Sequence, residues 1–406
     1  MPLSKSLWVL LGATSIVFHL SLIFSGLVPN LVSRPLHMAL ALPWVFLFAS
    51  QGLPSRISGA IFSIIGIACC LFIVLNESAL SDQYGYLSGS LQTAVAGALL
   101  LIVLEMARRA ISWPLPLVAG LALVYGIWGQ HLPGEFGHPG LPLQSFLGTL
   151  IITEGGLWGK LTGISVSIVA IFVIFGAVLN AGEAGQGFMN LATAAAGRLK
   201  GGAAKVSVLS SALFGSISGS ASANVASTGA ITMPAMTRLG YPKRIAGAVE
   251  AVASSGGQIM PPLMGAGAFV MVELTGVPYT GIMAAALLPA LLYFLTVWVG
   301  INAYTHRYQL GALGKDDQPD LRIVVITTLF FLVPFAILLE RMLLVGYTPQ
   351  YAACVAIVAA LVLLNFDSHF SFSVTRTLKR LESTCISSGT QIATIASIIL
   401  CASIVI

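Results

Sequence analysis

Oxygen-bearing side chains gather in one uncharged stretch of the chain, the run from Val206 to Thr237. Its middle part, Gly215 to Asn224, reads GSISGSASAN. Hydroxyl groups, amide groups and free backbone carbonyls are the ligands that a hard cation prefers, and they place no full charge in a membrane. The run therefore predicts a site for a cation such as sodium.

A second unusual stretch follows at Ile245 to Val272, which is long enough to cross a membrane but is interrupted. It contains GGQ at positions 256–258 and a Pro-Pro pair at 261–262. Glycine commonly closes a helix and proline commonly opens one, so the pattern predicts two half-helices. The free carbonyls that end the first half suit a cation, and the free N–H groups that begin the second half suit an anion. Interrupted segments of this kind point to a transporter's binding site.

Both stretches supply the predicted ligands. The predicted cation ligands are Ser216, Ser218, Gly219, Ser220, Asn224, Ser254, Ser255, Gly256 and Gly257. The predicted contacts of an anionic substrate are Asn224, Thr228, Gln258, Pro261, Pro262 and Leu263. The alternative is that the small residues only allow helices to approach closely, since Gly215 and Gly219 have the small-xxx-small spacing.

Composition determines the class of protein that holds these residues. Hydrophobic residues make up 57% of the chain and charged residues 8%, and the mean hydropathy is +0.94. These values predict an all-α polytopic membrane protein. The basic residues sit in short loops, where they indicate membrane orientation rather than a nucleic-acid partner. The five cysteines form no metal-binding or disulfide pattern, no phosphate-binding Gly-Lys loop is present, and no cofactor is expected.

Length and charge predict the order of the elements. Each arm of the run at 203–237 reaches roughly 18–20 Å, short of the hydrocarbon core of about 30 Å, so a re-entrant hairpin is expected. Basic residues at both of its ends place them in the cytoplasm, and the same bias places the N-terminus there. The first span is Leu7 to Pro29, and we interpret it as a span rather than a cleaved signal peptide. We expect a five-span scaffold block at 1–128 and a linker at 129–142. A first transport repeat is expected at 143–300, with the hairpin at 203–237 and the broken helix at 245–272. A cytoplasmic loop at 301–322 should follow, and then scaffold spans and the start of a second repeat at 323–406.

A weak internal symmetry links the last part of the chain to the first repeat. Phe370 to Ser383 resembles the surface helix expected at Leu143 to Gly159, and Cys385 to Ile406 resembles the span from Thr162 to Ala181. About eleven spans are expected in total. A second hairpin and a second broken helix should follow, so we expect an inverted repeat whose second copy is incomplete. The apolar ending IILCASIVI favours a truncated sequence over a short permease.

Two segments carry a specific resemblance: FGSISGSASANVASTGAITMPAM and GYPKRIAGAVEAVASSGGQIMPPLMGAGAFVMVELTGVPY. They resemble the large membrane subunit of the tripartite ATP-independent periplasmic (TRAP) transporters, in the form in which small and large subunits are fused. The resemblance is clear from about Leu150 to Tyr279. It implies an elevator-type transporter in the bacterial inner membrane that takes up organic acids, driven by a sodium gradient or a proton gradient. It also implies a periplasmic substrate-binding protein as partner.

Other interpretations of the same residues remain open. Glu250 suits either a proton-coupling group or, as we favour, an interfacial carboxylate paired with Lys243 or Arg244. His19 is expected to be a hydrogen-bonded helix residue. An intramembrane enzyme is disfavoured because the histidines form no H-E-x-x-H motif. A non-transporting scaffold subunit or permease remnant is the main alternative to a transporter.

Overall fold

The computed structural model describes residues 4–314 and 317–405, which form helices and loops with one isolated antiparallel bridge between Phe366 and Phe372. The chain divides into two compact units. The first unit runs up to Ala170 and includes the segment from Cys385 onwards, and the second runs from Ile171 to Thr384. Both boundaries fall inside helices.

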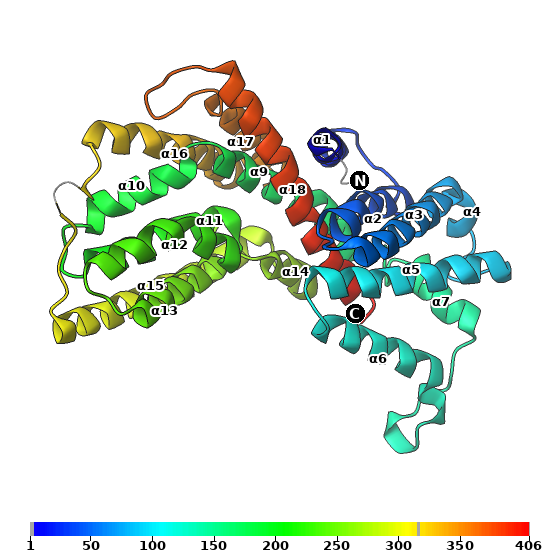
Figure 1. Cartoon of the computed structure of the whole chain (residues 1–406). Helices are drawn as coiled ribbons and strands as arrows, with labels where there is room; N and C mark the ends of the chain where they lie inside the picture. Colours follow the sequence, from blue (N-terminus) through cyan, green and yellow to red (C-terminus); the bar gives the residue numbers. More distant parts are fainter. Residues whose placement is uncertain (1–3, 315–316, 406) are drawn as a thin grey trace. The chain divides into compact units, whose positions relative to one another are not determined.

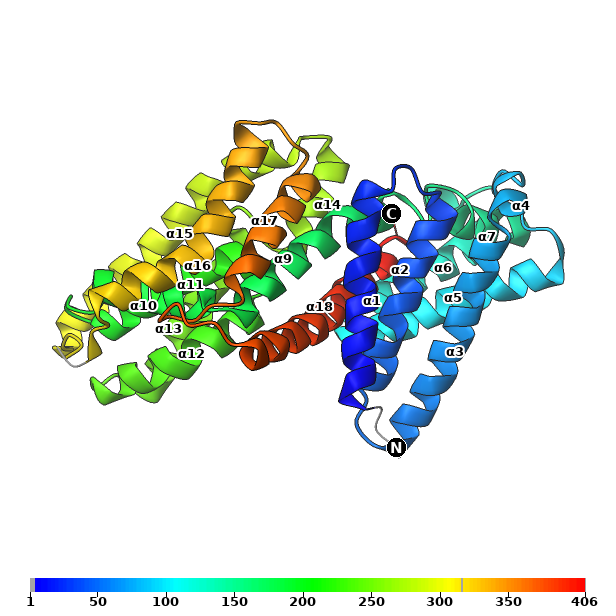
Figure 2. The same cartoon turned by 90° about the horizontal axis from the view of Figure 1, so that it is seen from above.

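The first unit is a bundle of long apolar helices (Figures 1 and 2). Its helices are α1 (Lys5–Phe24), α2 (Asn30–Pro43), which continues as a π-helical turn (Trp44–Phe48), α3 (Leu53–Leu75), α4 (Glu77–Ser81), α5 (Gly89–Ala110), α6 (Pro114–Trp128), α7 (Leu143–Ile151) and α8 (Lys160–Ile164), with short 3-10 turns at Gly129–His131 and Gly134–Phe136. A π-helical turn, Ser165–Val169, joins α8 to α9 (Ala170–Ala181).

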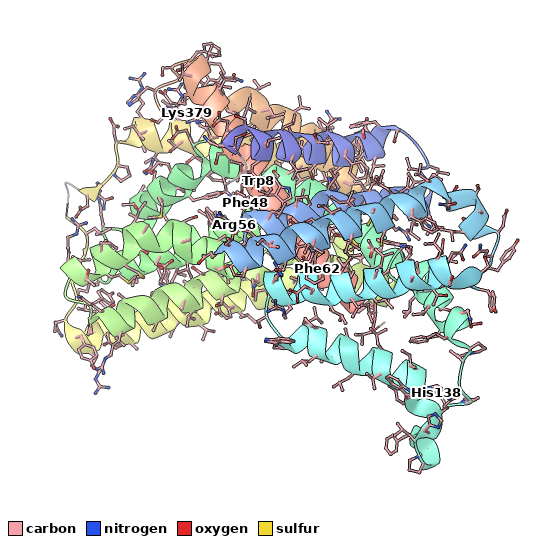
Figure 3. All side chains as sticks on the ribbon, turned by 45° about the vertical axis from the view of Figure 1, so that its right-hand side comes forward. Trp8, Phe48, Arg56, Phe62, His138 and Lys379 are labelled. Atoms are coloured by element: carbon pink, nitrogen blue, oxygen red, sulfur yellow. The ribbon has the colours of Figure 1, made fainter. Side chains whose placement is uncertain are left out.

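Aromatic rings and glycines set the packing of the first unit. The ring of Trp8 lies 4.9 Å from that of Trp44 and 5.0 Å from that of Phe48, centroid to centroid (Figure 3). A Cβ on Gly12 would lie 2.2 Å from the Cys385 carbonyl oxygen, and one on Gly389 would lie 2.3 Å from the Trp44 ring. The last helix of the chain therefore packs closely on α1 and α2.

Two histidines join three segments of this unit. His19 and His37 are both fully buried, and His19 Nε2 lies 2.7 Å from His37 Nδ1. His19 Nδ1 donates to the Ser15 carbonyl at 2.6 Å, so in the neutral pair His37 Nδ1 is the donor to His19 and Ser165 donates to His37 Nε2 at 3.0 Å. The prediction that His19 is a hydrogen-bonded helix residue is confirmed.

The second unit contains the predicted site. Its helices are α10 (Ala184–Ala196), α11 (Gly202–Ser218), α12 (Ala221–Arg238), α13 (Lys243–Gly256), α14 (Ala266–Thr275), α15 (Tyr279–Tyr308), α16 (Leu321–Leu343) and α17 (Pro349–Leu363), together with part of α9 and of α18 (Val374–Ala402). Helices α11, α12 and α13 pack against one another, and α15 packs against α11 and α13 (Figure 1).

Eight helices among the described residues are long and apolar enough to cross a membrane. They are Lys5–Phe24, Asn30–Phe48, Leu53–Leu75, Gly89–Ala110, Lys160–Ala181, Tyr279–Tyr308, Leu321–Leu343 and Val374–Ala402. The other three expected spans correspond to shorter helices: α6, α17 and the interrupted pair α13 and α14. The chain is thus a multi-pass membrane protein, and the predicted total of eleven spans stays a prediction.

The last helix differs from expectation. A surface helix at 370–383 followed by a separate span was expected, but α18 runs unbroken from Val374 to Ala402. No Gly or Pro lies at the expected junction, and the Thr384 hydroxyl donates to the Arg380 carbonyl at 2.9 Å, so the local backbone bonding is helical.

Arg380 ties α18 to two other parts of the second unit. Its guanidinium pairs with Glu183 and donates to the carbonyls of Leu364, at 2.9 Å, and Phe366. We expect Arg380→Gln to lower the free energy of unfolding by about 2–3 kcal/mol, because it leaves a largely buried carboxylate without its cation. Thermal unfolding of the purified protein in detergent measures this. Lys379→Gln is the control on an exposed position of the same helix (Figure 3), and equal effects of the two changes would contradict the prediction.

Candidate functional site

The hydroxyl-rich run forms two helices joined by a tight turn. Helix α11 ends where Gly219 takes a φ of +58°, and α12 begins after Ser220, whose hydroxyl accepts a hydrogen bond from the Ala223 N–H at 3.3 Å. A left-handed residue followed by an N-cap serine reverses the chain with no extra loop residues. The turn therefore brings two sets of hydroxyls side by side.

The interrupted segment has the form that its Gly and Pro residues indicate. Helix α13 ends at Gly256, a 3-10 turn covers Gly257–Ile259, and α14 begins only at Ala266. The Gly265 N–H closes the intervening loop by donating to the Gln258 carbonyl at 2.7 Å. From α15, the Tyr279 hydroxyl hydrogen-bonds the carbonyls of Pro262 and Leu263, the latter at 3.1 Å.

The turn of the hairpin sits directly on this break. A Cβ on Gly215 would lie 2.1 Å from Gly257 Cα, and a Cβ on Gly219 would lie 1.9 Å from the Met264 carbonyl oxygen. The Leu263 N–H donates to the Ser216 carbonyl at 3.3 Å. Backbone therefore touches backbone along the contact, which only glycine permits.

Asn224 is the fully buried amide at this junction. Its Nδ2 donates to the Ser211 carbonyl at 2.8 Å, and a Cβ on Gly257 would lie 2.8 Å from that same Nδ2. The Thr228 hydroxyl lies 2.8 Å from the Asn224 carbonyl oxygen and 3.4 Å from Asn224 Oδ1. Amide, hydroxyl and carbonyl oxygens are thus concentrated between α11, α12 and the broken helix.

Glu250 lies in the same region and corrects our interpretation of it. It is fully buried, and its carboxylate accepts hydrogen bonds from Ser207 at 2.8 Å, from Ser254 at 3.2 Å, and from Thr228 and Thr232. No basic side chain in the described part of the chain forms an ion pair with it. The expected pairing with Lys243 or Arg244 is wrong, because both cations are exposed at the start of α13 while Glu250 faces α11 and α12.

The other predicted residues lie in two groups. Ser216, Thr228, Ser254, Gly256, Gly257, Pro262 and Leu263 are buried, whereas Ser255 and Gln258 are exposed and Ser218, Gly219, Ser220 and Pro261 are partly exposed. The Ser216 hydroxyl bonds the Leu213 carbonyl at 2.6 Å, and the Ser255 hydroxyl bonds the Ala251 carbonyl at 2.8 Å. The exposed and partly exposed residues therefore line the outer side of the junction.

Four further residues of this region were not predicted as ligands: Ser207, Ser211, Thr232 and Tyr279. Three of them carry a signal that was present in the sequence, because Ser207 and Ser211, Thr228 and Thr232, and Glu250 and Ser254 are each spaced by four residues. Residues four apart share one face of a helix, so each helix presents a polar stripe. In the structure the three stripes meet: Ser211 Oγ lies 3.4 Å from both Thr228 Oγ1 and Ser254 Oγ.

The hydroxyl, amide and carbonyl oxygens of this region suit a monovalent hard cation. The uncharged N–H and O–H groups suit an anion that is bound without a basic side chain. Among the described residues no cluster of three or more His, Cys, Asp or Glu could hold a transition metal. Oxygen atoms of Asn224, Thr228 and Ser254 lie close together here, and they are of the type that such a cation binds. In this arrangement the tight turn between α11 and α12 packs against the break between α13 and α14, and polar groups lie between them.

Comparison with known proteins identifies the family to which the sequence is similar. Residues 98–406 match the family described as the tripartite ATP-independent periplasmic transporter, DctM component. The chain is 28% identical over 193 residues to the C4-dicarboxylate TRAP transporter large permease protein DctM of Pseudomonas aeruginosa, covering 47% of this chain and 44% of that protein. It is 27% identical over 205 residues to an uncharacterized protein, YgiK, of Salmonella typhimurium, covering 50% and 46%.

A third relative extends the match toward the N-terminus. The isethionate TRAP transporter permease protein DctMQ of Oleidesulfovibrio alaskensis is 25% identical over 376 residues, covering 87% of this chain and 53% of that protein. The chain spans about half the length of these curated relatives. Because the family match extends over most of the sequence, this chain belongs to the DctM component family of the tripartite ATP-independent periplasmic (TRAP) transporters.

Proposed function

We propose that the chain serves secondary active uptake of small organic anions across the bacterial inner membrane. The proposal rests mainly on the close contact between the hairpin turn and the broken helix. In this contact the backbones of Gly215 and Gly257 touch, and Asn224 is fully buried. Paired interruptions of this kind, lined by free backbone groups, hold ions and substrates in secondary transporters. Carboxylates are the proposed substrate class, since one curated relative is named for C4-dicarboxylate. Another is named for isethionate, which is a sulfonate and supports only the broader class of small organic anions.

A sodium ion is the proposed coupling ion. Its ligands would be oxygens of Ser216, Ser218, Gly219, Ser220 and Asn224 on the hairpin side, and of Ser254, Ser255, Gly256 and Gly257 at the end of α13. The substrate anion would lie toward Thr228, Gln258 and the loop of Pro261, Pro262 and Leu263, close to the N-terminus of α14. No other cofactor is required for this chemistry.

A periplasmic substrate-binding protein would deliver the anion, and the N-terminus would lie in the cytoplasm. The hairpin and broken helix would move as one body against scaffold helices, in the manner of an elevator. Their interlocked backbones support this, because a contact made between main-chain atoms at Gly215 and Gly219 holds the two elements together.

Uptake into proteoliposomes tests the proposal. Vesicles contain the purified chain and its cognate binding protein, and labelled organic acids are supplied under a sodium gradient or a proton gradient imposed separately. Sodium-driven uptake that Ser220→Ala lowers is the expected result. Sodium binding by the chain without any uptake would instead support a scaffold subunit, and absence of both would overturn the proposed ion site.

Ion binding can be followed without transport. Sodium that binds only the folded protein should raise the free energy of unfolding by about 2.7 kcal/mol at one hundred times its Kd. Potassium chloride at equal ionic strength is the control for screening. We expect thermal unfolding in detergent to shift upward with sodium and to stay unchanged with potassium.

A further inference from the structure

A cavity of about 590 Å³ lies at one end of the first unit. Residues of the π-helical turn at Trp44–Phe48, of the loop after it, of the first turns of α3 and of the end of α5 line this cavity. Its volume is within the range of about 300–1,000 Å³ that is typical of small-molecule sites. None of the residues that line it belongs to the proposed transport site, so the cavity has a role of its own to explain.

Two neighbouring arginines form the charged wall of the cavity. Arg108 donates to the Glu105 carboxylate from Nε at 2.6 Å and from Nη2 at 2.8 Å, and Arg109 Nε donates to the same carboxylate at 2.7 Å. One carboxylate therefore serves two guanidinium groups, and the cluster keeps a net positive charge. No acidic side chain is among the described residues that line the cavity. This charge favours an anionic ligand.

Arg109 is held in place by its surroundings. Its Nη1 donates to the Ser55 carbonyl at 3.2 Å, and its Nη2 donates to the Ser58 hydroxyl at 2.9 Å. The guanidinium carbon lies 5.1 Å from the centre of the Phe46 ring. A Cβ on Gly59 would lie 2.0 Å from the Phe46 carbonyl oxygen and 3.2 Å from Arg109 Nη1, so the glycine lets α3 approach both. A charged group that is already fixed loses little entropy when it binds a ligand.

Several N–H donors of the cavity are not used within the described part of the chain. A guanidinium has five N–H groups; Arg108 uses two of them and Arg109 uses three in the bonds given above. The side-chain amide of Gln51 is exposed at the cavity and makes no hydrogen bond to a described residue. The first turn of α3 also lies here, and the N-terminus of a helix attracts anions. These groups together suit the oxygens of a phosphate.

The position of the cavity indicates the source of the phosphate. Both α3 and α5 are long and apolar enough to cross a membrane, and the cavity lies where α3 begins and α5 ends. Trp113 is 59% exposed, and the centre of its ring lies 5.3 Å from the Arg108 guanidinium carbon. Exposed tryptophan and arginine at the end of a span are typical of the membrane–water interface. Leu53 and Ile57, next to cavity residues on α3, are exposed apolar side chains.

We propose that this cavity binds the phosphate headgroup of an anionic phospholipid. The phosphate accepts hydrogen bonds from Arg108, Arg109 and Gln51, and the acyl chains lie along the exposed apolar side chains of α3. The proposed orientation places this end of the unit at the cytoplasmic leaflet, where basic pockets between membrane helices bind anionic headgroups. A free phosphate would satisfy the same donors but would leave the apolar surface beside them uncovered.

Lipid titration followed by native mass spectrometry of the purified chain in detergent tests the proposal. The probes are dioleoylphosphatidylglycerol, dioleoylphosphatidylcholine and inorganic phosphate. We expect the first phosphatidylglycerol to bind about tenfold or more tightly than the first phosphatidylcholine, because the choline cation opposes the attraction between the phosphate and the arginines. Inorganic phosphate at the same concentration should not displace phosphatidylglycerol, because it lacks the apolar contacts of the acyl chains.

Two variants and a control locate the bound lipid. Ala49→Phe fills the cavity from an exposed position and removes no ion pair, and Arg108→Gln removes a charged donor. Each should raise the Kd for phosphatidylglycerol about tenfold or more. Arg56→Gln removes an equal charge from an exposed position of α3 that does not line the cavity, and it should keep the wild-type Kd (Figure 3). Ala49→Phe leaves both arginines paired, so it tests the site even where Arg108→Gln disturbs the fold.

The outcomes decide between the headgroup site and simpler explanations. Phosphatidylcholine that binds as tightly as phosphatidylglycerol would overturn the inference, because apolar contact alone would then account for binding. Displacement of the lipid by inorganic phosphate would overturn the lipid as the occupant. Equal losses in Arg108→Gln and Arg56→Gln would indicate general attraction by positive charge, which also contradicts a built site. Selective binding that both cavity variants lose and the control keeps would support the inference, whether or not the chain transports.

Discussion

Replacing Gly215 with alanine should reduce the initial rate of sodium-driven uptake by about 100-fold, because groups misplaced by about 1 Å lose efficiency on that scale. The new Cβ would lie 2.1 Å from Gly257 Cα and 2.9 Å from the Gly257 carbonyl carbon, so it meets backbone that cannot rotate away. The hairpin and the broken helix would be pushed apart. Overpacking of this kind also lowers the free energy of unfolding by about 1–3 kcal/mol.

A glycine elsewhere in the same unit provides the control. Gly247 lies on α13, and a Cβ added there would meet no atom within 4 Å. Gly247→Ala should therefore keep wild-type uptake, and it should gain slightly in stability because alanine favours helices by roughly 0.5–1 kcal/mol. Uptake in proteoliposomes and thermal unfolding of both variants give the comparison. If Gly215→Ala kept the wild-type rate of uptake, the contact between the hairpin turn and the broken helix would not be part of the transport site.

Asn224→Ala should lower the sodium affinity by at least tenfold and abolish sodium-driven uptake at concentrations that saturate the wild type. The substitution removes the proposed Oδ1 ligand and the hydrogen bond to the Ser211 carbonyl, which is 2.8 Å long and fully buried. Loss of that bond should cost about 1–3 kcal/mol of stability. Sodium-dependent stabilisation measures the affinity separately from uptake, so the two effects can be distinguished.

Ser222→Ala is the matched change at the same turn. Ser222 is exposed, and within the described part of the chain its hydroxyl hydrogen-bonds only to the Ser220 hydroxyl, at 3.3 Å. We expect this variant to bind sodium as the wild type does. Unchanged sodium affinity in Asn224→Ala would place the ion elsewhere, and equal losses in both variants would indicate a general disturbance of the turn.

The carboxylate of Glu250 changes how the site is understood. The sequence favours an interfacial charge pair, because Glu250 follows Arg244 closely in the chain. The contacts of a helical residue, however, depend on the side of the helix to which its side chain points. Glu250 faces α11 and α12, where the hydroxyls of Ser207 and Thr232 donate hydrogen bonds to it. The partners of Glu250 are therefore hydroxyl groups that are distant in the sequence, and not the basic residues that are near it in the sequence.

Composition and local chemistry determined the class of the protein, its family and the positions of its breaks. The long continuous apolar runs indicate a helical membrane protein, since a helix satisfies its backbone hydrogen bonds within one segment in lipid. Gly219 and Ser220 mark the reversal, and the Gly and Pro residues between positions 256 and 262 mark the broken helix. These features are local, because they depend on which backbone conformations each residue allows.

Only the tertiary structure decided which polar faces meet. Ser207 and Ser211 are four residues apart, as are Thr228 and Thr232, so each pair lies on one face of its helix. This spacing does not determine which other helix that face contacts. The partner depends on how α11, α12 and α13 rotate and approach, and the approach depends on the glycine contact between Gly215 and Gly257. The burial of Glu250 is therefore a property of three packed helices, which no single segment of the sequence specifies.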